Sequence, residues 1–203
     1  MDQGKILLVN LSKGRIGQEN SSFLGLLLLP RILISVFSRA KQDDSQRKPF
    51  YLYVDEFQNF TTPMLTTMLS EGRKYGLSLI LANQFISQLS DSVRDSVFGN
   101  VGTLGVFQVG VKDAHLLEQE MYPIFNLDDL VNFPAYHMAM KMPLGGASGR
   151  PFMVKTRPST LKKDPEMAKA LYDYTLSRYG RSMDVINAEI RHRFDTDPKP
   201  RQD

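Results

Sequence analysis

The chain has 203 residues, 42% of them hydrophobic and 23% charged, which is enough for one full domain with a core and too little for two. Its formal net charge of +3 permits nucleic-acid binding without demanding it, because such binding requires a clustered basic patch. The chain has no cysteine, which excludes disulfides, thiolate nucleophiles and cysteine-based metal sites; we therefore expect a cytoplasmic protein.

The first apolar run, residues 5–11, has the composition of a strand and passes through Asn10 into a polar, glycine-containing loop at 12–17. The next apolar stretch, 23–37, predicts a buried helix, capped by Ser21 or Ser22 and kinked or broken at Pro30. At about 15 residues it falls short of the roughly 20 that cross a bilayer, so we expect no transmembrane segment.

Residues 50–54 are five consecutive apolar or aromatic residues that run directly into two acids, Asp55 and Glu56. This pattern predicts a buried strand that delivers two carboxylates to the carboxyl edge of a sheet, where α/β proteins bind their ligands. A solvated strand end followed by a turn accounts for the same seven residues, so the rest of the chain has to decide.

A helix follows, with Thr62 and Pro63 as its cap and first turn and Gly76 as its left-handed stop. Residues 77–82 form another predicted strand, which ends in Asn83 and Gln84. Further along we expect a helix at 91–98, a strand at 101–109, a helix at 113–121, a peripheral hairpin of 136–141 with 151–155, and two C-terminal helices at 165–179 and from 182.

Alternating strands and helices predict an α/β fold with a mostly parallel sheet and right-handed crossovers. Asn10, Asp55 and Gln84 would then share one edge of that sheet. We divide the chain into a main domain at 1–160, a helical extension at 161–194 and a disordered tail at 195–203.

The chain resembles the HerA/FtsK-like P-loop ATPases, and within them the type IV secretion coupling proteins and conjugative DNA-transfer ATPases. The resemblance rests on the order and spacing of three stretches: the acidic strand at 51–60, the arginine-bearing helix end at 71–78, and the Gln-ending strand with its sequel at 81–89. It implies a RecA-like fold and ATP and Mg²⁺ as cofactors.

The resemblance also implies roles for four residues. Asp55 would hold the Mg²⁺ shell as the Walker B acid, and Glu56 would orient and deprotonate the attacking water. Gln84 would sense the γ-phosphate or the water. Arg73 is a candidate arginine finger for a neighbouring subunit, although a solvated helix arginine fits the sequence as well.

One departure from the family is serious, because the chain contains no Gly-x-x-x-x-Gly-Lys-Ser/Thr to cradle phosphates. The sequence therefore resembles the C-terminal half of a motor domain. We expect ATPase activity from the complete motor, and weak or no ATP binding by this chain alone.

Two weaker candidates remain. Lys13 and Arg15 are placed to contact the DNA backbone in a central channel, and an exposed turn is the simpler alternative. The three histidines, His115, His137 and His192, lack metal-ligand spacing.

The expected function is a segment of a hexameric, DNA-translocating ATPase of conjugation or type IV secretion, cytoplasmic or held at the inner membrane face by a partner or a further segment. Two alternatives stay open: a non-catalytic interaction module that keeps the fold without a P-loop, and a secretion ATPase that moves protein.

Overall fold

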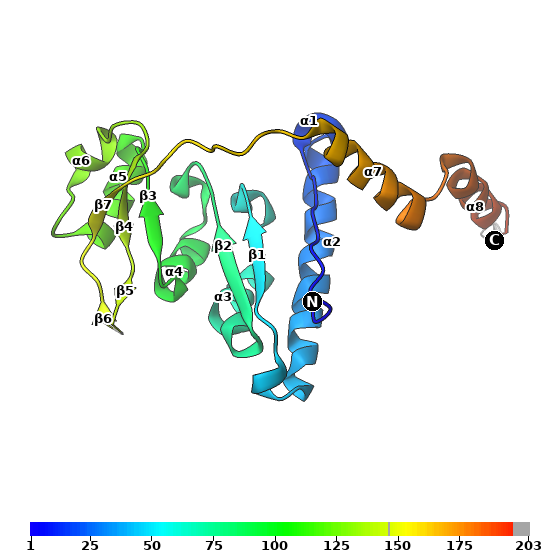
Figure 1. Ribbon diagram of the computed structural model, residues 1–203, viewed down its shortest axis with the longest axis horizontal. Coiled ribbons are helices and arrows are strands. Elements are labelled where there is room, and N and C mark those ends of the chain that lie inside the picture. Colours follow the sequence, from blue (N-terminus) through cyan, green and yellow to red (C-terminus); the bar gives the residue numbers. More distant parts are fainter. Residues whose placement is uncertain (146, 197–203) are drawn as a thin grey trace, which may run out of the picture. The chain divides into compact units, whose positions relative to one another are not determined.

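The computed structural model describes residues 1–145 and 147–196 (Figure 1). These fall into two compact units, Met1–Arg157 and Pro158–Asp203. Each unit is described by itself below, and the candidate site lies in the first.

The predicted strand at residues 5–11 is not formed. This segment is extended and its apolar side chains are exposed, with Ile6 at 88% and Leu8 at 82%. A segment with strand composition forms a strand only when it pairs with a neighbouring strand. In the described sheet β1 pairs with β2 alone, so residues 5–11 have no such neighbour. The loop that follows contains one helical turn, α1 (Lys13–Ile16).

The apolar helix α2 spans Gln18–Phe37 and continues through Pro30 rather than ending there. It begins before Ser21, whose hydroxyl donates to the Leu11 carbonyl at 2.6 Å, so the capping prediction is wrong. Two short 3₁₀ turns follow, η1 (Ser38–Lys41) and η2 (Asp44–Gln46).

The prediction that α2 is buried holds for one face only. Gly25, Leu29, Ile32, Leu33 and Val36 face the core, whereas the other face exposes Phe23, Leu24, Leu26, Leu27 and Ile34. The stretch Gln18–Lys41 is long and apolar enough to cross a membrane by length and composition, a test that a core helix also passes.

The centre of the first unit is a βαβ unit, as predicted. Strand β1 (Phe50–Val54) leads through the 3₁₀ turn η3 (Phe57–Phe60) into helix α3 (Pro63–Glu71) and turn η4 (Gly72–Tyr75). Gly76 ends this stretch in the left-handed conformation, with φ +73°, and the chain returns as β2 (Leu77–Leu81). The two strands are parallel, with Phe50 opposite Leu77 and Val54 opposite Leu81.

Helices α2 and α3 pack on one face of this strand pair (Figure 1). Side chains on successive strand residues alternate between faces, so Leu52 and Leu79 join the core with Met68 and Val36. The opposite face, which carries Tyr51 and Tyr53, is exposed.

The rest of the first unit is built around a second core. Its elements are η5 (Ile86–Gln88), α4 (Asp91–Asn100), β3 (Leu104–Val106), α5 (Val111–Met121), α6 (Leu127–Val131), β4 (His137–Lys141), β5 (Pro143–Leu144), β6 (Ala147–Ser148) and β7 (Phe152–Lys155). The strands β3, β4 and β7 form an antiparallel sheet in that order, so the predicted hairpin is confirmed. The strand predicted at 101–109 is shorter than expected.

The second unit contains the predicted helical pair, α7 (Pro165–Tyr179) and α8 (Met183–Thr196). The Asp164 carboxylate caps α7 by accepting from the Met167 N–H at 2.8 Å. The tail was predicted to begin two residues too early, because α8 includes 195 and 196; the remainder of the predicted tail, 197–203, lies outside the described residues. The α/β class is thus confirmed, with a parallel pair at its centre.

Candidate functional site

The carboxyl ends of β1 and β2 meet at one edge of the sheet, as parallel strands must. Pairing continues just past the strands, because Ala82 N–H donates to the Val54 carbonyl at 3.0 Å and Phe57 N–H donates to the Ala82 carbonyl at 3.1 Å. These bonds fix where the acids after β1 and the amides after β2 emerge.

Glu56 and Gln84 are in direct contact at this edge. The Gln84 side-chain N–H donates to Glu56 Oε1 at 2.7 Å, and the Gln58 amide donates to Glu56 Oε2. Glu56 is half-buried, whereas Gln84 is exposed. The structure therefore joins two residues that lie 28 positions apart in sequence and that were both predicted for the site.

The backbone at Glu56 is unusual. Its φ of 49° and ψ of 44° lie in the left-handed region, which non-glycine residues occupy at a cost. The Asp55 carboxylate accepts from the Glu56 N–H at 3.0 Å, and the Asn59 amide donates to the Glu56 carbonyl at 2.9 Å. These two bonds hold the turn that points Glu56 at Gln84.

Asp55 is exposed at the end of β1, and only its Oδ1 is used by the Glu56 N–H. A free carboxylate oxygen is a ligand type that Mg²⁺ accepts directly or through water, so Asp55 fits the predicted metal role. In the described ranges 1–145 and 147–196, no three His, Asp or Glu side chains gather into a metal site of their own.

Two packing contacts support the site from behind. A Cβ on Gly25 of α2 would lie 2.3 Å from the Phe60 ring, so only glycine lets η3 approach this closely. The buried Asp113 carboxylate of α5 accepts from the Ser87 N–H at 3.0 Å and ties down the loop that follows Gln84. Neither residue was predicted. A glycine within an apolar helical run, such as Gly25, is a signal of close packing that could have indicated this contact.

Lys13 reaches the same edge by a route that the sequence did not predict. Its ammonium donates to Asn59 Oδ1 at 2.9 Å, although the strand expected before it is missing. Asn10, the third residue predicted for the edge, instead accepts from the Ser12 N–H at 3.0 Å. Arg15 is exposed on α1.

Arg73 lies apart from these residues. It is exposed in η4, which precedes β2 and so stands at the amino end of the strand pair, opposite Glu56 and Gln84 (Figure 1). The structure therefore does not bring Arg73 to the Glu56 of its own chain.

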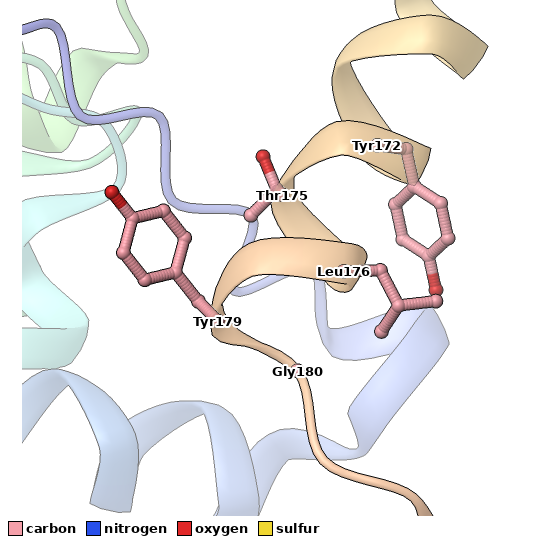
Figure 2. A pocket seen from close by; sticks show the side chains of 5 residues that line it. All are labelled: Tyr172, Thr175, Leu176, Tyr179 and Gly180. Atoms are coloured by element: carbon pink, nitrogen blue, oxygen red, sulfur yellow. The ribbon is translucent and has the colours of Figure 1, made fainter.

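A hollow beside the last turns of α7 has a different character (Figure 2). Its lining is Tyr172, Thr175, Leu176, Tyr179 and Gly180, and the Thr175 hydroxyl is already bonded to the Leu171 carbonyl. We do not include it in the candidate site.

Residues 49–119, which span β1 through most of α5, match the family model described as the TraM recognition site of TraD and TraG. The resemblance to the type IV coupling proteins is confirmed. A search among curated proteins finds no significant match.

Solved structures agree in fold. The plasmid coupling protein TrwB in complex with the non-hydrolysable ATP analogue ADPNP matches with a TM-score of 0.51 at 17% identity, over 65% of this chain and 37% of that chain. Its complex with a GTP analogue gives the same values. The unbound conjugative coupling protein TrwBdeltaN70 matches with a TM-score of 0.50 at 16% identity, over 62% and 35% of the two chains.

These similarities confirm that the chain shares the α/β fold of the TrwB structures. The chain spans little more than a third of the length of the TrwB structures that it matches.

Proposed function

We propose that this chain is part of an ATP-driven coupling protein of conjugation or type IV secretion and contributes the hydrolytic edge of its motor domain. The contact between the Glu56 carboxylate and the Gln84 amide, at the carboxyl end of two parallel strands, is the observation that supports this most. Crevices at that end of the sheet are where RecA-like and other α/β proteins bind ligands.

The side chains suit the chemistry assigned to them. Glu56 is held at the edge by two amide donors, so its carboxylate is oriented to accept a proton from a water molecule. Gln84 is exposed, and its amide can donate to an oxygen that gains charge during phosphoryl transfer. Asp55 would hold the Mg²⁺ that neutralises the phosphate charge when nucleotide is bound.

The phosphate loop has to come from a segment outside this sequence. We call the combination of this chain with that segment the assembled ATPase. In it, Arg73 would serve the site of a neighbouring copy, because it stands at the opposite end of the strands from its own Glu56. A head-to-tail contact of this kind closes into a ring, in agreement with the hexamer that the resemblance implies.

We infer that the cargo is DNA and that the partners belong to a conjugation or secretion apparatus. The description of the matching family names a recognition site for TraM, so residues 49–119 would also offer a surface to a protein of that kind. Lys13 and Arg15, exposed on α1, are the proposed contacts to the DNA backbone. Such a motor works on the cytoplasmic side of the membrane.

Substitution of Glu56 tests the proposal. In the assembled ATPase, Glu56→Gln keeps the size of the side chain and one acceptor oxygen, but it removes the basicity and replaces the second acceptor oxygen with an NH2 donor. We expect kcat to fall at least about 100-fold while nucleotide binding stays within about twofold, because a general base contributes about 10² to 10⁴. Steady-state hydrolysis and equilibrium nucleotide titration measure the two quantities.

The matched control is Glu166→Gln, which neutralises an exposed carboxylate in the first turn of α7. Its turnover should equal that of the wild type. Normal turnover in Glu56→Gln would remove Glu56 from the role of general base.

A further inference from the structure

Two arginines outside the Glu56 site donate hydrogen bonds to the backbone carbonyls that follow Arg73. Arg39, in η1 just after α2, is fully buried, and its Nη1 donates to the Tyr75 carbonyl at 3.0 Å. Its Nη2 pairs with the Asp2 carboxylate at 2.7 Å. A fully buried guanidinium is rare in proteins unless its charge is compensated.

Arg47 uses all three nitrogens of its guanidinium and so joins η4 to the backbone of η1 and the residue that follows it. Its Nη1 donates to the Lys74 carbonyl at 2.8 Å, its Nη2 to the Gln42 carbonyl at 2.6 Å, and its Nε to the Arg39 carbonyl at 3.0 Å. The group also lies 5.8 Å from the centre of the Tyr75 ring. Only arginine offers this many donors in a fixed plane.

The two η4 carbonyls that accept from these arginines belong to Lys74 and Tyr75, directly after Arg73. Carbonyls in the last turn of a helix lack partners within the helix, so side-chain donors decide how firmly the turn is held. The turn is also tied to the sheet, because Phe50 N–H donates to the Gly76 carbonyl at 2.8 Å. Gly76 fits closely here: a Cβ on it would lie 3.4 Å from Arg39 Nη1.

We propose that Arg39 and Arg47 are positioning residues that fix turn η4, so that the exposed Arg73 is presented to the Glu56 site of a neighbouring copy. This inference rests on the proposed function. The Arg73 side chain itself is exposed, so the placement of its guanidinium depends on the order of its backbone. A charge delivered across a subunit boundary acts only when its position is fixed to a fraction of an ångström.

Arg47 is the residue to substitute, because loss of the buried Arg39 threatens the fold itself. The matched control is Arg94→Ala. Arg47 and Arg94 each pair with an acid three residues earlier, Asp44 and Asp91, and both arginine side chains are mostly buried. Arg94, however, lies on α4, and its guanidinium donates to Asp91.

Hydrogen exchange on the chain itself gives the first measurement. Gly76 N–H donates to the Arg73 carbonyl at 3.1 Å, so its exchange reports the closure of η4. We expect Arg47→Ala to raise exchange at 74–76 at least about tenfold, as expected where a local opening becomes easier. Arg94→Ala should leave it unchanged. Equal protection in Arg47→Ala and wild type would overturn the positioning role.

Turnover of the assembled ATPase gives the second measurement of the positioning role. We expect Arg47→Ala to lower kcat about tenfold with KM for ATP unchanged, as a misplaced catalytic group does. Equimolar mixing with Glu56→Gln copies should restore about a quarter of wild-type turnover, because a quarter of the boundaries then pair an intact Glu56 with an intact η4. A variant that merely misfolds gains nothing from such mixing.

The outcomes separate the two proposals. If Arg73→Ala turns over normally, the role of Arg73 in the proposed function fails. If Arg73→Ala is inactive but Arg47→Ala is normal, or is not restored by mixing, the positioning inference alone fails.

Discussion

At the residue scale, the contacts of the Glu56 carboxylate define what the site can do. Both of its oxygens accept from amides, Gln84 and Gln58, and the turn that carries it is held by Asn59. The sequence predicted Glu56 and Gln84, because residues that follow parallel strands emerge at the same edge. It did not predict Gln58, Asn59 or Arg47, because ordinary polar residues in a turn show their partners only once the chain is folded.

Arg39 and Asp2 form an ion pair whose strength depends on pH. Burial by itself raises the pKa of the Asp2 carboxyl, but the Arg39 guanidinium, the Gln42 amide and the N-terminal ammonium together bring the pKa below its ordinary value. A carboxyl with a lowered folded-state pKa stabilises the fold above its unfolded pKa, near 3.8, and loses this contribution as the pH falls through the folded value.

Asp2→Asn should therefore lower the thermal unfolding midpoint at neutral pH, because it leaves the buried Arg39 without its counter-charge. The difference from the wild type should shrink as the pH falls through the acid range. Asp43→Asn is the control, since the Asp43 side chain makes no capping bond at η2. A difference that is the same at every pH would contradict the ion-pair explanation.

At the element scale, the βαβ unit could be predicted because each of its signals is local: apolar runs for β1 and β2, Pro63 at the start of α3 and Gly76 at the end of η4. The segment 5–11 shows the limit of such signals. Its composition is that of a strand, but strand formation depends on a neighbour that the sequence of the segment does not specify. The exposed face of α2 shows the same limit, because the apolar composition of the helix does not specify which of its faces finds a partner.

The packing of α2 against η3 makes a prediction about stability. In Gly25→Ala the new methyl would overlap the buried Phe60 ring. We expect a loss of about 1–3 kcal/mol from overpacking, offset in part by about 1 kcal/mol of helix propensity. Urea unfolding followed by circular dichroism measures the net change.

Gly99→Ala is the matched control, because Gly99 also lies in a helix, α4, and a Cβ there meets nothing within 4 Å. This variant should be as stable as the wild type or more stable by up to about 1 kcal/mol. Equal effects of the two substitutions would show that the contact with Phe60 does not limit the packing of α2.

At the scale of the whole molecule, the chain carries the proposed hydrolytic edge of a motor domain, and its sequence contains no phosphate loop. It matches little more than a third of TrwB, and it exposes apolar side chains at residues 6–9 and on one face of α2. We propose that the boundary between main domain and helical extension falls near residue 160. The first unit would then be the part that completes a motor.

The chain alone should therefore bind ATP·Mg²⁺ weakly or not at all. Carboxylates and amides at a strand edge orient a phosphate group, whereas the affinity for nucleotide comes from the backbone donors and lysine of a phosphate loop. Isothermal calorimetry of the purified chain measures this. A dissociation constant in the micromolar range would show that the chain holds nucleotide by means not identified at the Glu56 edge.

The position of η4 has one more consequence. Glu56 stands at one end of the β1–β2 pair and Arg73 at the other, separated by five-residue strands about 16 Å long. In the proposed ring, the β1–β2 pair of each copy thus connects two consecutive nucleotide sites. A displacement at one site would reach the next through the hydrogen-bonded backbone of the two strands, so the two sites would be coupled to each other.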